Sequence, residues 1–150
     1  MDISARNINT FLFFKLPSAF WCGVRTKSID NQRCTTTVKH RWISQNPFKS
    51  MYFAVQAMAA ELSTGALVMS HIQQSNREIS MLVASNKSAF FKKATGRITF
   101  TCQEGDKIAE AISRTIATGE GQTCWMQSIG TNDKGEIVSE MDFEWTVKLK

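Results

Sequence analysis

Glu61 is the residue whose type fits its surroundings least, because it is an acid in the middle of a long apolar segment. Residues 50–69 are rich in Ala and Met and are long enough for about five helical turns, with Ser50 as a plausible N-cap. An unpaired carboxylate in such a helix must raise its pKa or find donors elsewhere, so it is a candidate acid or base. The neighbours of Glu61 on the same helical face include no cation; they are Ala54, Ala57, Met58, Thr64, Gly65 and Val68. Periodicity alone leaves two alternatives open, in which this arc of the helix faces solvent or a distant Lys or Arg pairs with Glu61.

Asn46 precedes this helix in an Asn46-Pro47 pair that ends a predicted strand. Asn commonly caps turns, and spacing alone favours that role. The amide could instead point into a site beside the helix start, where free backbone N–H groups and the helix dipole carry partial positive charge. A site of that kind can hold the oxyanion that develops when a carbonyl is attacked.

The hydrophobic periodicity of the chain predicts several strands wrapped around one helix, and this fold would position Glu61 and Asn46. A helix that is apolar nearly all round is buried on most sides, so we expect an antiparallel sheet to cover it. Residues 1–20 predict a short helix that ends before Pro17. The other expected elements are strands at 23–29, 33–42, 79–86 or somewhat beyond, 96–102, 122–130 and 137–150, and a second helix at 106–118.

Two of the expected strands show the alternation of a half-buried sheet. In the last strand the apolar face is formed by Ile137, Met141, Phe143, Trp145, Val147 and Leu149. In strand 33–42, one face carries Cys34, Thr36, Val38, His40 and Trp42.

Length and composition exclude several classes of protein. A chain of 150 residues with 43% apolar residues predicts one domain, residues 1–150, and excludes a disordered chain. The net charge of +5 is modest and the cations look scattered, so nucleic-acid binding is not expected. Lys87, Lys92, Lys93 and Arg97 gather near one turn, either as a phosphate-binding group or as an ordinary solvated edge.

Cysteine and histidine spacing gives no metal site. Cys22, Cys34, Cys102 and Cys124 are too far apart for a zinc site, and His40 and His71 have no ligand partner at suitable spacing. Reduced thiols in a cytoplasmic protein are the simplest interpretation. No run reaches the 18 consecutive apolar residues of a membrane span, so stable membrane insertion is not expected.

The Asn46-Pro47 pair, the long Ala-rich helix and the acid fifteen residues after the Asn together resemble the hotdog-fold thioesterases. The sequence is most similar to the phenylacetate-pathway type of acyl-CoA thioesterase and its uncharacterised thioesterase-like relatives, over about residues 23–150. The resemblance implies an α+β hotdog fold, an antiparallel sheet around a long central helix, with the short helix 106–118 as an insertion. It also implies a homodimer or tetramer with sites at the subunit interface, an acyl-CoA or acyl-carrier thioester as substrate, and no metal or other cofactor.

The same resemblance assigns roles to residues. Glu61 takes the place of the family's base or nucleophile, and Asn46 the place of the Asn that positions the thioester carbonyl or water. The family's frequent His-Gly-Gly at the helix start is replaced by Tyr52-Phe53-Ala54, where the Phe53 N–H can still donate although the larger side chains narrow the site. The other expected substrate contacts are Tyr52, Gln56, Thr64, a helper hydroxyl at Ser80, and Lys92 and Lys93 on the CoA phosphates.

The leading prediction is therefore an acyl-CoA thioesterase. One alternative is a non-catalytic acyl- or lipid-binding hotdog protein whose Tyr52 and Phe53 close the site. A dehydratase-like hotdog enzyme is a third possibility, but it would usually carry a His near the helix start, where this sequence has Tyr52.

Overall fold

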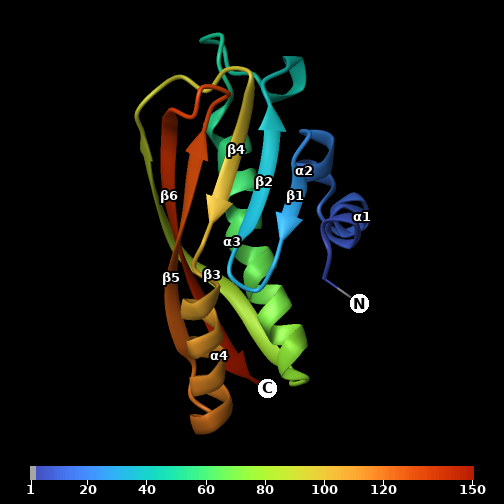
Figure 1. The fold of residues 1–150 in the computed structure, drawn as a ribbon, viewed down its shortest axis with the longest axis vertical. Helices are drawn as coiled ribbons and strands as arrows, with labels where there is room; N and C mark the ends of the chain where they lie inside the picture. The colour runs from blue at the N-terminus through green and yellow to red at the C-terminus, as the bar shows by residue number, and fades with distance from the viewer. Residues whose placement is uncertain (1–2) are drawn as a thin grey trace.

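The computed structural model describes residues 3–150 and shows a six-stranded antiparallel sheet curled around one long helix (Figure 1). The strand order is β1-β2-β4-β5-β6-β3, so β1 and β3 form the two edges of the sheet. The helices are α1 (Ala5–Lys15), α2 (Pro17–Trp21), the central α3 (Phe53–Ser75) and α4 (Gly105–Thr118), with a short 3₁₀ turn η1 (Trp42–Ser44). The strands are β1 (Arg25–Ile29), β2 (Cys34–Lys39), β3 (Ile79–Phe90), β4 (Arg97–Cys102), β5 (Gln122–Thr131) and β6 (Ile137–Leu149).

The central helix α3 forms where the sequence predicted a buried helix, but its ends differ. It begins at Phe53 rather than Ser50, because Ser50 is bonded into the preceding loop and Tyr52 is the N-cap. It continues six residues beyond 69 to Ser75, since its polar last turns are fixed to the β1–β2 turn. There His71 Nε2 lies 2.8 Å from the Asn31 carbonyl oxygen, and Gln74 Nε2 donates to Asn31 Oδ1 at 2.9 Å.

Hydrogen bonds from the sheet fix the rotation of α3 about its own axis. From β2, Thr36 Oγ1 donates to the Ala59 carbonyl at 2.6 Å. From β6, Trp145 Nε1 donates to Thr64 Oγ1 at 2.9 Å. Because these groups are buried, leaving any of them unpaired would cost more than the bond itself contributes. The side of α3 that points away from the sheet is therefore fixed as well.

The expected hairpins and the inserted helix are present, with local corrections. As predicted, the first helix ends before Pro17, since α1 ends at Lys15. Pro17 then takes the first position of a second, short helix, α2, where its missing N–H costs nothing. Strand β3 extends past Asn86 to Phe90, as the prediction allowed, because it stays paired with β6 along its whole length. Trp42 lies in η1 and is 83% exposed, and Ile137 at the start of β6 is 44% exposed, so neither belongs to a buried strand face.

The helix α3 has the length and mean hydropathy of a membrane-spanning segment, and within residues 3–150 no other helix does. The most apolar stretch of 18 residues in α3 is 67% buried inside the fold, and such burial is typical of the core helix of a globular domain.

Helix α4 sits so close to the β1–β2 turn that its first residue must be glycine. A Cβ on Gly105 would lie 1.9 Å from the Asn31 carbonyl oxygen, which is backbone and has no room to move. We expect Gly105→Ala to lower the free energy of unfolding by about 2–3 kcal/mol. The matched control is Gly121→Ala, whose Cβ would meet nothing nearer than 3.9 Å. Urea denaturation of both variants measures the difference, and equal midpoints would contradict the close approach.

Candidate functional site

Glu61 lies on the side of α3 that the sheet leaves partly open. Its carboxylate is beside Gly65 and the ring of Trp145, since a Cβ on Gly65 would be 3.2 Å from Glu61 Oε1 and 3.1 Å from Trp145 Cζ2. Trp145 is on β6, the strand next to the free edge strand β3. Within residues 3–150, the carboxylate of Glu61 takes part in no ion pair and accepts no hydrogen bond.

Burial without a partner changes the acidity of this group. Loss of hydration raises the pKa of Glu61 from 4.5 to about 7, and no neighbouring charge opposes that shift. Both alternatives that the sequence left open are thus excluded, because Glu61 neither points into bulk solvent nor pairs with a Lys or Arg. A carboxyl group with a pKa near neutrality can exchange a proton at physiological pH, as a general base must.

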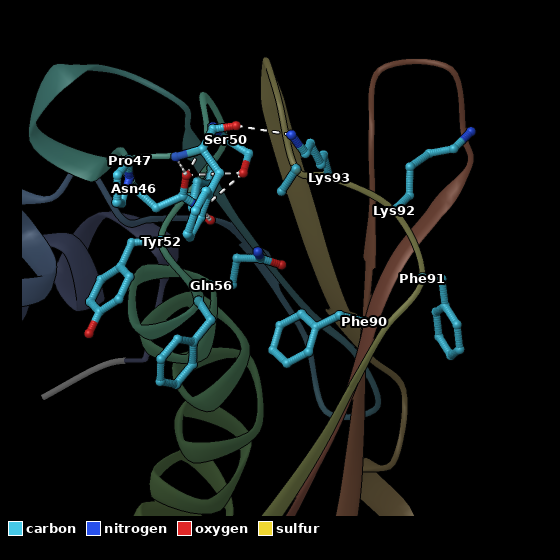
Figure 2. A pocket seen from close by; sticks show the side chains of 13 residues that line it. Asn46, Pro47, Ser50, Tyr52, Gln56, Phe90, Phe91, Lys92 and Lys93 are labelled. Atoms are coloured by element: carbon cyan, nitrogen blue, oxygen red, sulfur yellow. Dashed lines mark hydrogen bonds between the residues drawn. The ribbon is translucent and has the colours of Figure 1, made fainter.

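A cavity of about 470 Å³ lies at the N-terminal end of α3 (Figure 2). This volume is within the range of small-molecule sites. Its walls come from three places: the loop 46–51, the start of α3, and the end of β3 with the segment 91–94 that follows it. An aromatic rim surrounds it, with the Phe53 ring 5.1 Å from Tyr52 and 6.4 Å from Phe90. Tyr52 and Phe53 are 47% and 57% exposed, so they line the cavity without closing it.

The helix start at this cavity has free donors. Tyr52, the N-cap residue, makes no side-chain capping bond. The N–H groups of Val55 and Gln56 donate to the Tyr52 carbonyl, whereas those of Phe53 and Ala54 have no acceptor within residues 3–150. Two unpaired N–H groups at the positive end of a 23-residue helix form a suitable place for a developing oxyanion. The Ala54 N–H was not singled out by the sequence, although its position next to Phe53 could have indicated it.

Asn46 lines the cavity, but all of its polar atoms are used in the loop that it organises. Its Oδ1 accepts from the backbone N–H groups of Phe48 at 2.8 Å and Ser50 at 3.2 Å. Its Nδ2 donates to Ser50 Oγ at 2.9 Å and to the Met51 carbonyl at 3.3 Å. The capping role that spacing favoured is the one the structure shows, and the amide has no free donor for a substrate.

Gln56 is the polar side chain best placed to contact a ligand here. It projects from the first turns of α3 into the cavity (Figure 2) and is only 4% exposed. Its Oε1 accepts from Ser139 Oγ at 3.0 Å, which fixes the amide orientation. That bond leaves Nε2 as a donor at the inner end of the cavity.

The lysines expected to bind phosphate are both at the cavity but already have partners. Lys92 forms an ion pair with Glu136, and Figure 2 shows its ammonium pointing away from the cavity. Lys93 Nζ donates to the Phe48 carbonyl at 3.1 Å, across the cavity mouth. Both remain exposed, so a phosphate would compete with these contacts rather than meet free cations.

Two expected contact residues lie elsewhere. Thr64 is fully buried, and its hydroxyl is used twice, as acceptor from Trp145 and as donor to the Glu61 carbonyl. Ser80 is on the far end of β3 and donates to the Lys148 carbonyl at 3.2 Å. Neither lines the cavity. Thr64 is on the buried face of α3, and Ser80 is at the end of β3 that lies away from Phe90.

Glu61 does not line this cavity either. It is eight residues along α3 from Phe53, which places its backbone about 12 Å further down the helix axis. The acid and the free amides of one chain are thus too far apart to act on one carbonyl.

No metal site accompanies these residues. Within residues 3–150, no cluster of three or more His, Cys, Asp or Glu has an arrangement that could hold a metal ion. Two aromatic residues of the cavity were not predicted from the sequence: Phe90, the last residue of β3, and Phe91, which follows it. Their positions depend on where β3 ends.

A family comparison matches almost the whole chain. Residues 5–147 match the model of DUF4442, a domain family of unknown function. The chain belongs to this family. A comparison with curated proteins gives no match.

Solved structures establish the fold of this DUF4442 domain. A protein of unknown function from Pseudomonas aeruginosa, PA5026, described as a probable thioesterase, has a TM-score of 0.80 at 17% identity, over 97% of this chain and 96% of that one. A protein of unknown function from Chlorobaculum tepidum has a TM-score of 0.83 at 14% identity, over 99% and 98%. The thioesterase HI1161 from Haemophilus influenzae has a TM-score of 0.74 at 11% identity, over 99% and 93%. The resemblance to hotdog-fold thioesterases is thereby confirmed at the level of the fold.

The raised pKa of Glu61 predicts a pH-dependent cost to stability. Because the folded state holds this proton more tightly than the unfolded chain, stability falls as pH rises from about 4.5 to about 7 and is level above that range. Glu61→Gln removes this effect, so its free energy of unfolding should exceed that of the wild type increasingly across the window, by up to about 3 kcal/mol.

Urea denaturation at a series of pH values measures this difference. Glu120→Gln, at an exposed position after α4, makes the same chemical change and serves as the control. A constant difference between Glu61→Gln and the wild type at all pH values would show that Glu61 is well hydrated.

Proposed function

We propose that this protein is an acyl-CoA thioesterase that acts as a homodimer, with each site built from two chains. The observation that carries the proposal is the isolated, partly buried carboxyl group of Glu61 on the open side of α3. The thioesterase-like fold of the neighbours supports a thioester as substrate. Coenzyme A as the thiol carrier comes from the sequence resemblance.

The sheet edge at β3 supports the dimer. This strand pairs with β6 on one side, and its other side has no partner strand within residues 3–150. It is twelve residues long and mostly exposed, with Leu82 68% exposed. A long edge strand with exposed apolar side chains is a template for pairing with another chain. Two copies joined at β3 by two-fold symmetry would set their α3 helices antiparallel, with Glu61 of each near the α3 start of the other. A tetramer could form from two such dimers.

Hydrolysis at this composite site needs three actions from the chain. The ionised carboxylate of Glu61 takes a proton from a water molecule as the water oxygen attacks the thioester carbonyl carbon. The N–H groups of Phe53 and Ala54 of the partner subunit stabilise the oxyanion that forms. As this intermediate collapses to the carboxylic acid, the C–S bond breaks and Glu61 returns its proton to the departing thiolate of the carrier. In direct attack, the Glu61 carboxylate displaces the thiolate to give an anhydride, which water then cleaves, and the same groups are used.

The remaining cavity residues position the substrate. Gln56 Nε2 donates to the acyl part, and the aromatic rim of Tyr52, Phe53 and Phe90 contacts its apolar portion. Asn46 acts as a positioning residue, because it holds the loop that shapes the cavity. Lys92 and Lys93 approach the phosphates of coenzyme A by exchanging their present partners.

A non-catalytic acyl-binding protein is the second candidate. It is favoured by one observation, that the cavity of a single chain is aromatic and does not include Glu61. In that case ligands bind without turnover and Glu61 has no role.

We also propose a cytoplasmic location, which suits the four unpaired thiols of Cys22, Cys34, Cys102 and Cys124.

Thioester hydrolysis by Glu61→Gln separates these functions. We expect the wild type to release free thiol from at least one member of an acyl-CoA panel of increasing chain length. Loss of the general base should lower kcat by about 10²–10⁴-fold, with KM little changed, because the substrate contacts remain. Glu120→Gln should retain wild-type rates.

The pH profile of kcat/KM adds a second readout. It should rise through an apparent pKa near 7, as the ionised form of Glu61 is the active one. Turnover unchanged in Glu61→Gln would contradict the thioesterase mechanism, and saturable acyl-CoA binding with no turnover in any variant would establish the second candidate.

A further inference from the structure

A patch of exposed aromatic side chains lies on α1 and α2, outside the candidate site. We name it the aromatic patch; its members are the exposed Phe13, Phe14 and Trp21, the half-buried Phe20, and Leu16, which lies between the two helices. Phe14 and Trp21 are 70% and 61% exposed, and Phe13 is 45% exposed. The Phe13 ring centroid is 4.9 Å from that of Phe14, 5.0 Å from that of Phe20 and 6.4 Å from that of Trp21, so these rings form one continuous surface.

The aromatic patch has a rigid base. The opposite face of α1 buries Ile8 and Leu12 completely in the core. Asn9 ties the same helix to β1, because its Nδ2 donates to the Thr26 carbonyl at 3.0 Å and its Oδ1 accepts from the Thr26 N–H at 2.7 Å. The aromatic side chains are thus held outward by packing and are not a loose terminal segment.

Cations surround the aromatic patch. The Arg25 guanidinium lies 3.8 Å from the Phe20 ring centroid, and Arg6 shares a hollow with Phe13 and Phe14. Lys15, which lies between Phe14 and Leu16 in the sequence, has an exposed side chain. Arg41, the residue before η1, lies close to Gly23, where an added Cβ would be 2.5 Å from its Nη2, and its charge acts on Arg25.

The charges of the chain are not scattered, contrary to the sequence-based expectation. Residues 3–60 hold eight Lys and Arg and a single acid, Asp30, whereas residues 61–150 hold ten Lys and Arg and eleven acids. The excess positive charge therefore belongs to the part of the chain that carries α1, α2, β1 and β2. These elements lie together on one side of the molecule (Figure 1).

We propose that the aromatic patch binds the surface of an anionic phospholipid bilayer. Aromatic side chains partition into the boundary between headgroups and acyl chains, and Lys and Arg beside them meet lipid phosphates. A second copy fits this surface poorly, because a two-fold contact would place Arg6, Lys15 and Arg25 of one copy near the same cations of the other. The patch adjoins β1, at the opposite edge of the sheet from β3, so a dimer joined at β3 leaves it free.

Sedimentation of the full chain with lipid vesicles tests this inference. We expect binding to vesicles that contain phosphatidylglycerol, weak binding to vesicles of phosphatidylcholine alone, and release as the salt concentration rises. Phe14→Ser/Trp21→Ser should lower the partition coefficient at least about tenfold, and Arg6→Glu/Lys15→Glu should do the same.

Matched controls isolate the patch. Lys148→Glu/Lys150→Glu makes the same change in net charge at the end of β6, and Ile137→Ser removes another exposed apolar side chain. Both should bind as the wild type does, and circular dichroism checks that all variants are folded.

Three outcomes would overturn the inference. The first is no binding of the wild type to anionic vesicles. The second is equal loss of binding in the patch variants and the charge control, which would show a general effect of net charge. The third is a smaller mass of Phe14→Ser/Trp21→Ser by light scattering without lipid, which would show that the patch joins copies of this chain.

Discussion

The structure depends on covering a long apolar helix with a single curled sheet. Most of α3 is buried against β2, β4, β5 and β6, where hydroxyl and indole groups such as Thr36 and Trp145 fix its rotation. One sheet cannot enclose the whole circumference, so a strip of α3 stays partly open. Glu61 lies on that strip, dry enough that its pKa rises to about 7 yet without a counterion. The constraint that holds the fold together thus also leaves an isolated carboxyl group whose pKa is close to neutrality.

The same constraint explains why the chemistry is divided between two places. The free N–H groups of Phe53 and Ala54 are at the start of α3, whereas Glu61 is about two turns further along. A rigid helix keeps these groups apart within one chain. In the dimer that we propose, an antiparallel α3 from a second chain would bring an acid to each set of amides, with the unpaired edge of β3 as the place of attachment. The proposed activity therefore depends on formation of the dimer.

Local patterns were enough to predict the hairpins, α4 and the burial of α3, because each depends on neighbours within a few residues. They showed that no cation shares the helical face of Glu61, but they left open whether a distant Lys or Arg pairs with it. Contacts between distant segments could not be predicted in this way. The partners of Lys92 and Lys93 come from β6 and from the loop before α3, and the hydroxyl of Thr64 is used by a Trp from the last strand. The role of Asn46 as a loop cap followed from its spacing, but the complete use of its amide did not. The uneven distribution of charge could have been found by counting charged residues region by region, because the net charge of the whole chain conceals it.

Mixing two inactive variants tests the shared site most directly. Phe53→Pro removes one N–H at the first position of α3, where proline is tolerated, and Phe53→Ala keeps that N–H as a control for the lost ring. Glu61→Gln removes the base. If each site takes Glu61 from one chain and the Phe53 N–H from the other, a hybrid dimer has one site with both lesions and one intact site. An equal mixture unfolded and refolded together should then recover about one quarter of wild-type hydrolysis, since about half of the dimers are hybrids. Activity no higher than that of the separate variants would contradict a site shared between two chains.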